Sequence, residues 1–207
     1  MAVGGRRMSR IVVVNFMTVD GVVQSVLSAD EDREGGFRAG GWVQPYMDDV
    51  VGRVMSTATT GAGGLLLGRK TYQTFAATWS GADQSEPAVA ALNRLPKYVV
   101  STTLTGADWQ NSHILGGDLM AELNRLKAQP GADIVVFGSS GLIPTLVGAD
   151  LIDEYTLLVF PLVLGGGKRM FAEGTAPTTL TLQGTEVSTT GVVILRYARR
   201  RDQEHRK

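Results

Sequence analysis

The chain has 207 residues, 43% of them apolar, and its 20 basic and 20 acidic residues give a formal net charge of zero. This length is typical of one globular domain, and the balanced charge argues against a nucleic-acid binder, which carries a basic excess. The absence of cysteine excludes disulfides and zinc–thiolate sites, and two histidines are too few for a multi-histidine metal centre. No apolar run approaches the roughly 20 residues that cross a bilayer, so we expect a soluble, cytoplasmic protein without a metal.

The first half of the chain alternates strand and helix. After a loose start, a β-branched run predicts a buried strand over residues 10–17, which ends at the turn signal Asp20-Gly21. A polar, glycine-rich loop follows over residues 24–41, and loops of this length in compact domains usually have a function. Apolar residues at helical spacing predict a helix over residues 42–59. The next expected elements are a strand at 65–67, helices at 69–76 and 87–95, and a strand at 97–101.

The second half continues the alternation and closes with a hairpin. The expected elements are a strand at 112–115, a helix at 118–128, a strand at 134–137, a helix at 142–147, a strand at 154–164, and antiparallel strands at 180–187 and 192–199. Strands that alternate with helices predict a mostly parallel sheet covered on both faces, with the hairpin as an antiparallel edge. With no repeat or linker, we expect one domain over residues 1–207, with its core at about 10–200.

Two of these strands end at glycine and lead into a helix. One corner has the sequence GGLLLGRKT at residues 63–71, and the other has DIVVFGSSG at residues 133–141. Backbone N–H groups and the positive end of a helix dipole meet at such a corner, and glycine lets a ligand approach the backbone. Two corners predict a dinucleotide with several phosphates, and the neighbouring Arg69 and Lys70 predict the additional phosphate of NADPH.

The first corner matches neither common nucleotide-binding motif. It is not a Walker A loop, because Arg69 stands between Gly68 and the Lys70-Thr71 pair. It is not a Rossmann fingerprint, because Leu66 occupies the place of the third glycine. The alternative that these glycines only turn a strand into a helix stays open. The serine and threonine side chains near the other strand ends favour cofactor binding.

Carboxylates near the predicted crevice are candidates for catalysis. Asp20 follows the first strand, where a side chain can orient a substrate or relay a proton, and a simple turn residue is the alternative. Asp48 is the second candidate, and a solvated helix acid is its alternative. The segment 165–167 with Lys168 and Arg169 predicts either a site for a substrate phosphate or a tight turn.

The order of these motifs resembles the dihydrofolate reductase-like superfamily. It looks closest to the reductase domain of the bifunctional riboflavin-biosynthesis deaminase–reductase, a 5-amino-6-(5-phosphoribosylamino)uracil reductase. The resemblance spans about residues 10–200. The motifs that carry it are TVDG at 18–21, LGRKTY at 67–72, PKYVVS at 96–101, IVVFGSSG at 134–141, LIDEY at 151–155 and PLVLGGG at 161–167.

The resemblance implies a three-layer α/β/α domain that binds NADPH in extended form. Ser139 stands where the folate enzymes carry a second glycine. The implied contacts are Asn15 beside the nicotinamide and substrate; Gly68, Arg69, Lys70 and Thr71 at the 2′-phosphate and pyrophosphate; Ser101 and Thr102 at the adenosine; and Gly138, Ser139, Ser140, Gly141 and Leu142 at the pyrophosphate.

The expected function is NADPH-dependent reduction of a C=N or C=O bond in a pteridine-, pyrimidine- or similar heterocycle-like small molecule. The cofactor supplies the hydride, and the protein supplies orientation and electrostatics. The competing interpretation is a non-catalytic nucleotide-binding or regulatory module that kept the fold. The resemblance and the apolar hairpin segment 192–195 also predict a homodimer. We expect no nucleic-acid or membrane partner.

Overall fold

The structure is a computed structural model that describes residues 7–200, so residues 1–6 of the expected loose start lie outside the described part. Its eight strands form one sheet in the order β4-β3-β2-β5-β1-β6-β8-β7. The strands are β1 Ile11–Thr18, β2 Gly64–Gly68, β3 Lys97–Val100, β4 Ser112–Leu115, β5 Ile134–Phe137, β6 Ile152–Phe160, β7 Leu180–Val187 and β8 Val193–Arg199. The strands from β4 to β6 pair in parallel, whereas β8 and β7 pair antiparallel.

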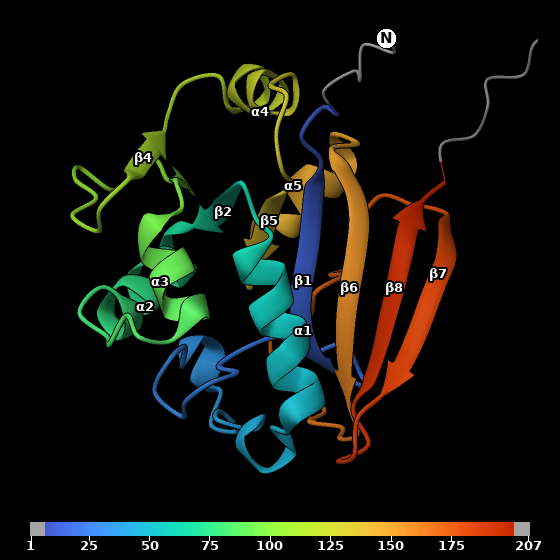
Figure 1. Cartoon of the computed structure of the whole chain (residues 1–207). Helices are drawn as coiled ribbons and strands as arrows, with labels where there is room; N and C mark the ends of the chain where they lie inside the picture. The colour runs from blue at the N-terminus through green and yellow to red at the C-terminus, as the bar shows by residue number, and fades with distance from the viewer. Residues whose placement is uncertain (1–6, 201–207) are drawn as a thin grey trace, which may run out of the picture.

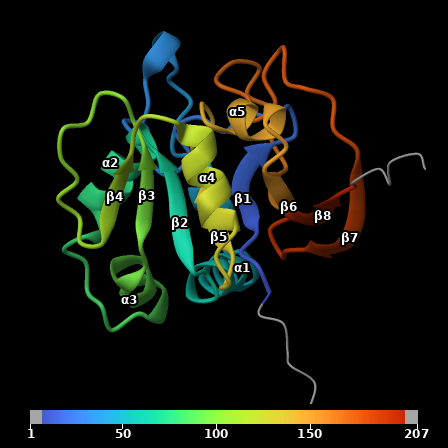
Figure 2. The same ribbon diagram turned by 90° about the horizontal axis from the view of Figure 1, so that it is seen from above.

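Helices cover both faces of this sheet. The helices are α1 Asp49–Thr60, α2 Arg69–Trp79, α3 Pro87–Arg94, α4 Leu119–Lys127 and α5 Ile143–Gly148, with short 3-10 turns at Glu34–Gly36 and Gln44–Tyr46. In Figures 1 and 2, α1, α2 and α3 lie on one side of the sheet, and α4 and α5 lie on the other. The three-layer fold with a mostly parallel sheet and an antiparallel C-terminal edge is therefore confirmed.

Alternation along the central strands builds two apolar cores. Successive side chains of a strand point to opposite faces, so a buried strand supplies both sides. On β1, Val12 and Val14 belong to the core under α1, α2 and α3, whereas Ile11 and Val13 belong to the core under α4 and α5. This is why the central strands are continuous apolar runs in the sequence.

The predicted helix over residues 42–59 is wrong at its beginning. The α-helix begins only at Asp49, because the carboxylate of Asp48 accepts a hydrogen bond from the Val51 N–H at 2.9 Å and caps the helix. Trp42 and Val43 are buried, but the loop and the 3-10 turn Gln44–Tyr46 place them there rather than the helix. Apolar spacing in the sequence alone did not distinguish burial by a helix from burial by a loop.

The hairpin also differs from the expectation in one respect. The predicted sheet edge at residues 192–195 is not an edge, because β8 lies between β6 and β7. Val192 and Ile194 are fully buried. The outer strand is β7, which exposes Leu182 and Val187. The strand predicted at 154–164 ends at Phe160, so the glycine run at 165–167 belongs to the following loop.

Parallel pairing brings the functional segments to one edge. The strands β3, β2, β5, β1 and β6 run in the same direction, so their carboxyl ends lie along one side of the sheet. In Figure 1, β1 and β6 point downward, and the blue loop between β1 and α1 lies at this lower end. Ligands of open α/β sheets bind beyond the carboxyl ends of the strands.

Candidate functional site

The two glycine corners of the sequence meet in space because β2 and β5 are neighbours in the sheet. The Gly68 N–H donates a hydrogen bond to Ser139 Oγ at 2.9 Å. The Ser139 N–H in turn donates to Thr71 Oγ1, also at 2.9 Å. These reciprocal bonds lock the start of α2 against the turn that follows β5. The hydroxyl of Ser139 therefore makes a hydrogen bond that a glycine at this position could not make.

The turn after β5 has a fixed and unusual backbone. Gly138 and Ser139 are consecutive residues with positive φ, at 53° and 54°. A Cβ atom on Gly138 would lie 3.1 Å from Thr71 Oγ1, so α2 approaches this backbone closely. The side chain of Asn15, buried on β1, donates from Nδ2 to the Gly138 carbonyl at 2.9 Å. Three neighbouring strands thus hold this turn in one shape.

Helix α2 presents its N-terminus at the joined corners. It has 11 residues, and Gly68 at its N-cap provides no side-chain cap. The first N–H groups of a helix have no partner within the helix, and the helix dipole makes this end positive. Arg69 stands at the first position and donates from Nη1 to Gln73 Oε1 at 3.2 Å. The residues here are of the types that hold a phosphate group.

The remaining predicted cofactor residues lie at the same edge of the sheet. Ser101 follows β3, and its hydroxyl accepts hydrogen bonds from the Thr103 and Leu104 N–H groups at 3.2 and 3.0 Å. Thr102 is exposed beside it. Leu142 is buried, so only its backbone could face a ligand. Ser140 and Gly141 complete the turn between β5 and α5.

Lys70 already has anionic partners within the protein. Its ammonium lies 2.5 Å from Glu34 Oε2 and 3.3 Å from Asp32 Oδ1. Lys168 contacts the same two carboxylates, at 2.5 and 2.6 Å. The two ammonium groups, first that of Lys168, lower the pKa of Glu34 to about 2. Sequence reasoning missed both carboxylates, and the acidic residues 30–34 of the long loop were the available signal.

Asp20 joins the turn after β1 to the loop after β6. Its carboxylate accepts hydrogen bonds from the Thr18 hydroxyl at 2.5 Å, the Leu164 N–H at 3.2 Å and the Gly165 N–H at 2.9 Å. These bonds, first that from Thr18, lower the pKa of Asp20. Arg169 donates from Nε to the Asp20 carbonyl. The side chain is therefore a carboxylate at neutral pH, and its oxygens accept hydrogen bonds from the groups around them.

Asp48 lies at the same end of the sheet but toward the hairpin. Besides capping α1, its carboxylate accepts hydrogen bonds from the N–H and the hydroxyl of Thr189, at 2.8 and 2.7 Å. These bonds, first that from Val51, lower the pKa of Asp48 to about 2. Asp48 thus joins α1 to the turn between β7 and β8. The catalytic roles assigned to Asp20 and Asp48 stay predictions.

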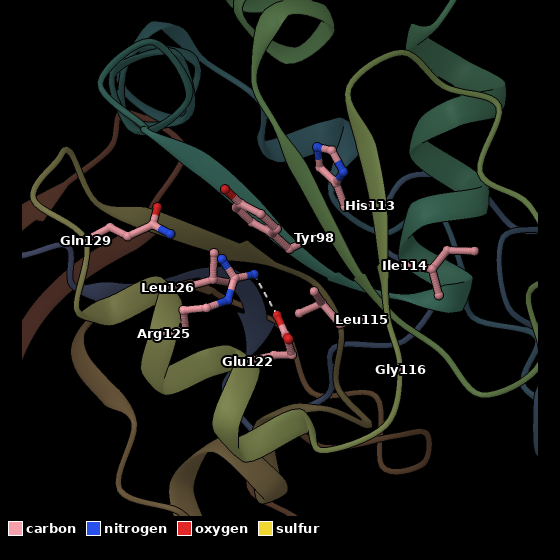
Figure 3. A pocket seen from close by; sticks show the side chains of 9 residues that line it. All are labelled: Tyr98, His113, Ile114, Leu115, Gly116, Glu122, Arg125, Leu126 and Gln129. Atoms are coloured by element: carbon pink, nitrogen blue, oxygen red, sulfur yellow. Dashed lines mark hydrogen bonds and ion pairs between the residues drawn. The ribbon is translucent and has the colours of Figure 1, made fainter.

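A separate hollow of about 380 Å³ lies between α4 and the strands β3 and β4. Figure 3 shows Tyr98 and His113 side by side within it, with ring centroids 6.0 Å apart. Arg125 also lines the hollow and is paired with Glu122 at 2.7 Å. The lining residues include none from the glycine corners. We therefore place the candidate site at the corners, where the predicted residues are brought together.

Neither a cluster of metal-binding side chains nor a membrane-spanning helix is found in the part of the chain that the structure describes. Within residues 7–200, no three histidine, aspartate or glutamate side chains gather where they could hold a metal ion. Over the same range, no helix has both the length and the apolar character needed to cross a bilayer.

The fold is dihydrofolate reductase-like. The structure resembles the dihydrofolate reductase of Enterococcus faecalis, solved with NADP(H) and RAB-propyl, with a TM-score of 0.62 and 12% identity over 94% of this chain and 99% of that one. It also resembles a protein from Shewanella sp. PV-4 that has been assigned to riboflavin biosynthesis. That similarity has a TM-score of 0.65 and 21% identity over 93% of this chain and 99% of that one.

The chain belongs to the RibD C-terminal domain family, whose model matches residues 9–194. This confirms the resemblance to the riboflavin reductases and the reductase-like character of the domain. Among curated relatives, protein YyaP of Bacillus subtilis (strain 168), described as uncharacterized, is 36% identical over 101 residues. That alignment covers 49% of this chain and 53% of the relative, so the match spans about half the length of each.

Proposed function

We propose that this protein is an NADPH-dependent reductase of a pteridine-, pyrimidine- or similar heterocycle-like small molecule. The observation that carries the proposal is the lock between the two corners. It places the uncapped start of α2 and the glycine turn after β5 against each other, with Arg69 and Lys70 alongside. This combination suits a ligand with two or more phosphate groups.

In this proposal the chain's own residues bind and orient the reactants. The N–H groups at the start of α2 and those of Ser140 and Gly141 face the pyrophosphate, since the N–H groups of Ser139 and Leu142 are bonded within the protein. Arg69 and Lys70 face the 2′-phosphate. Ser101 and Thr102 lie toward the adenosine. Asn15, fixed by its bond to the Gly138 carbonyl, lies where β1 meets the nicotinamide side. The bound cofactor supplies a hydride to the heterocycle.

The cofactor assignment makes a direct prediction about NADPH and NADH. The double variant Arg69→Ala, Lys70→Ala should lose NADPH affinity far more than NADH affinity, because only NADPH carries the 2′-phosphate. A charge-assisted phosphate contact contributes about 1.5–3 kcal/mol, so we expect a loss of at least about tenfold for NADPH. Calorimetric titration of both cofactors measures it. Because Lys70 also contacts Glu34 and Asp32 of the loop between β1 and α1, the NADH titration reports any effect of losing those contacts.

A matched control removes two positive charges elsewhere. Arg53 and Arg196 both pair with Glu186, and both lie outside the glycine corners. The variant Arg53→Ala, Arg196→Ala should leave NADPH affinity within about twofold of the parent. Equal losses of NADPH and NADH in the Arg69, Lys70 variant would contradict the assignment of the 2′-phosphate.

Turnover is tested with a panel of pteridines and pyrimidines, followed at the NADPH absorbance. Oxidation of NADPH that depends on one heterocycle class identifies the substrate. Tight NADPH binding without turnover on any member would instead support the non-catalytic nucleotide-binding module.

A further inference from the structure

The long loop between β1 and α1 is fastened across the site by polar contacts. We call residues 30–37 the acidic loop. Gln24 donates from Nε2 to the Asp32 and Glu34 carbonyls, both at 3.0 Å, and its Oε1 accepts from the Lys168 N–H at 2.9 Å. Gln24 thereby ties the acidic loop to the segment that follows β6. The loop has a defined position relative to both lysines.

An apolar contact supports the same arrangement. Gly167 has a φ of 115°, and a Cβ atom there would lie 2.8 Å from Phe37 Cε2. The glycine therefore lets the ring of Phe37 lie directly against the backbone that precedes Lys168. The acidic loop therefore contacts this segment at Phe37 as well as at Asp32 and Glu34.

The centre of the contact is one oxygen atom shared by two cations. Glu34 Oε2 lies 2.5 Å from Lys70 Nζ and 2.5 Å from Lys168 Nζ. Asp32 offers one oxygen to each lysine, Oδ1 to Lys70 and Oδ2 to Lys168. Two ammonium groups that converge on one anionic oxygen form the arrangement that also binds a phosphate oxygen.

Solvent reaches the ion pairs between the acidic loop and the two lysines, so another anion can replace the carboxylate. The side chains of Glu34, Lys70 and Lys168 are 62%, 51% and 33% exposed. Ion pairs that water reaches contribute little to stability, typically about 0.2–1 kcal/mol each. A phosphate group carries up to two negative charges and three acceptor oxygens, so it competes well for the same pair of lysines.

We propose that the acidic loop is an internal competitor for ligand phosphate, in which Glu34 holds Lys70 and Lys168 together until a phosphate of the ligand replaces it. Lys168, which the sequence connected with a substrate phosphate or a tight turn rather than with the cofactor, thereby becomes a second cation of the phosphate site. The ligand class rests on the proposed function, whereas the exchange itself requires only an anion of the phosphate type. Binding of the ligand phosphate and release of the acidic loop from the two lysines then occur together.

The first test compares two variants that each remove one negative charge from the same loop. Glu34→Gln removes the shared oxygen's charge, whereas Asp30→Asn removes a charge that pairs with Arg33. We expect Glu34→Gln to bind 2′,5′-ADP about fivefold more tightly than the wild type in a calorimetric titration, the effect of losing two exposed pairs. Asp30→Asn should stay within about twofold of the wild type.

A third variant separates competition from simple loosening of the loop. Lys168→Met also breaks the contacts to Glu34 and Asp32, so it frees the loop as Glu34→Gln does. It removes a cation that the ligand needs, so we expect weaker binding of 2′,5′-ADP rather than tighter binding. Tighter binding in both variants would mean that the loop obstructs the site without competing for the lysines.

A measurement without any nucleotide keeps the inference separate from the proposed function. Inorganic pyrophosphate should speed tryptic cleavage of the wild type at Arg33 and Arg38, relative to chloride at the same ionic strength, because it displaces the loop. If NADPH and 2′,5′-ADP bind neither the wild type nor Glu34→Gln while pyrophosphate still speeds cleavage, the proposed function fails and the exchange stands. Cleavage that does not respond to pyrophosphate overturns the exchange. So does nucleotide binding that is measurable and equally tight in Glu34→Gln and Asp30→Asn.

Discussion

At the scale of single residues, Asp20 has the position expected of a catalytic carboxylate and the hydrogen bonds expected of a structural one. It lies just beyond β1, at the ligand-binding edge of the sheet, and it also holds the Leu164 and Gly165 amides. Its lowered pKa keeps the side chain ionised, which favours orienting a substrate over donating a proton. A nearly isosteric substitution can separate these roles.

We expect Asp20→Asn to leave NADPH affinity within a few-fold of the wild type and to lower turnover by about 10²-fold or more, the usual scale for losing acid–base help. The amide keeps the size of the side chain but removes its charge. The measurement is steady-state turnover on a substrate found in the heterocycle panel. Asp48→Asn is the matched comparison, and a loss of turnover there without one in Asp20→Asn would move the catalytic role to Asp48.

Lys97 is a residue whose burial the sequence did not signal. Its side chain is fully buried on β3, where Nζ donates to the Asn93 and Gln110 carbonyls at 2.8 and 3.0 Å. The ammonium also lies 4.1 Å from the ring centre of Trp109. Burial lowers the pKa of Lys97 to about 8. Its polar contacts join α3 to the segment that precedes β4.

The buried ammonium predicts an unusual dependence of stability on pH. Between pH 8 and about 10, unfolded Lys97 binds a proton that the folded protein has released, so the free energy of unfolding should rise with pH. We expect this residue to contribute about 1–3 kcal/mol of the rise. Burial raises the pKa of Tyr155 to about 12, so above pH 10 that group opposes the trend.

Chemical denaturation at pH 7, 8, 9 and 10 measures the dependence, and Lys97→Met is the reference. The methionine removes the titration, so the difference in unfolding free energy between the wild type and the variant should grow from pH 8 to pH 10. A difference that stays constant over this range would show that Lys97 keeps its ordinary pKa.

At the scale of elements, the corner after β5 depends on the element beside it. The sequence after β5 predicts a glycine turn, but the shape of that turn also depends on Thr71 of α2. The Thr71 hydroxyl accepts a hydrogen bond from the Ser139 N–H, and the side chain lies against Gly138. The sequence pattern indicates only that glycine at this corner lets a ligand approach the backbone. The positive φ and the close approach of Thr71 add a cost in stability that the sequence pattern did not indicate.

We therefore expect Gly138→Ala to lower the free energy of unfolding by about 1–2 kcal/mol, because left-handed backbone strains an alanine. NADPH affinity should fall as well, because the turn moves away from Thr71. Thermal unfolding and calorimetric titration measure the two effects. Gly141→Ala is the control in the same turn, since a Cβ atom there meets nothing within 4 Å. Full NADPH affinity in Gly138→Ala would place the phosphate elsewhere.

At the scale of the whole molecule, the sheet leaves β7 as an outer strand. Leu182 and Val187 of this strand are 51% and 64% exposed. Exposed edge strands with apolar side chains favour pairing with another chain, and symmetric pairing of two copies is the commonest form. The expected homodimer stays a prediction, now placed at β7 rather than at residues 192–195.

Light scattering across a range of concentrations should give a mass near twice the 22.1 kDa of one chain. The variant Leu182→Lys, Val187→Lys should shift it toward the monomer, because charges at an edge oppose pairing. Val163→Lys changes another exposed residue, 67% exposed in the loop after β6, and should leave the mass unchanged. A monomer mass for the wild type at every concentration would contradict the prediction.

The sequence by itself determined the order of strands and helices, the three-layer architecture and the position of both glycine corners. These features depend on local patterns, since apolar runs, helical spacing and glycine punctuation act over neighbouring residues. It also led to the prediction, still to be tested, that the two corners bind one dinucleotide. The family resemblance added the reductase class, which the family match then supported.

The tertiary structure alone decided which partner each functional side chain has. Lys70 meets Glu34 across 36 positions of the chain, and Asp20 meets Gly165 across 145. Such pairs depend on how the loops at the ends of neighbouring strands pack, and no local pattern encodes that packing. The sequence therefore predicted a free cation at Lys70, whereas the folded chain has already placed an anion beside it.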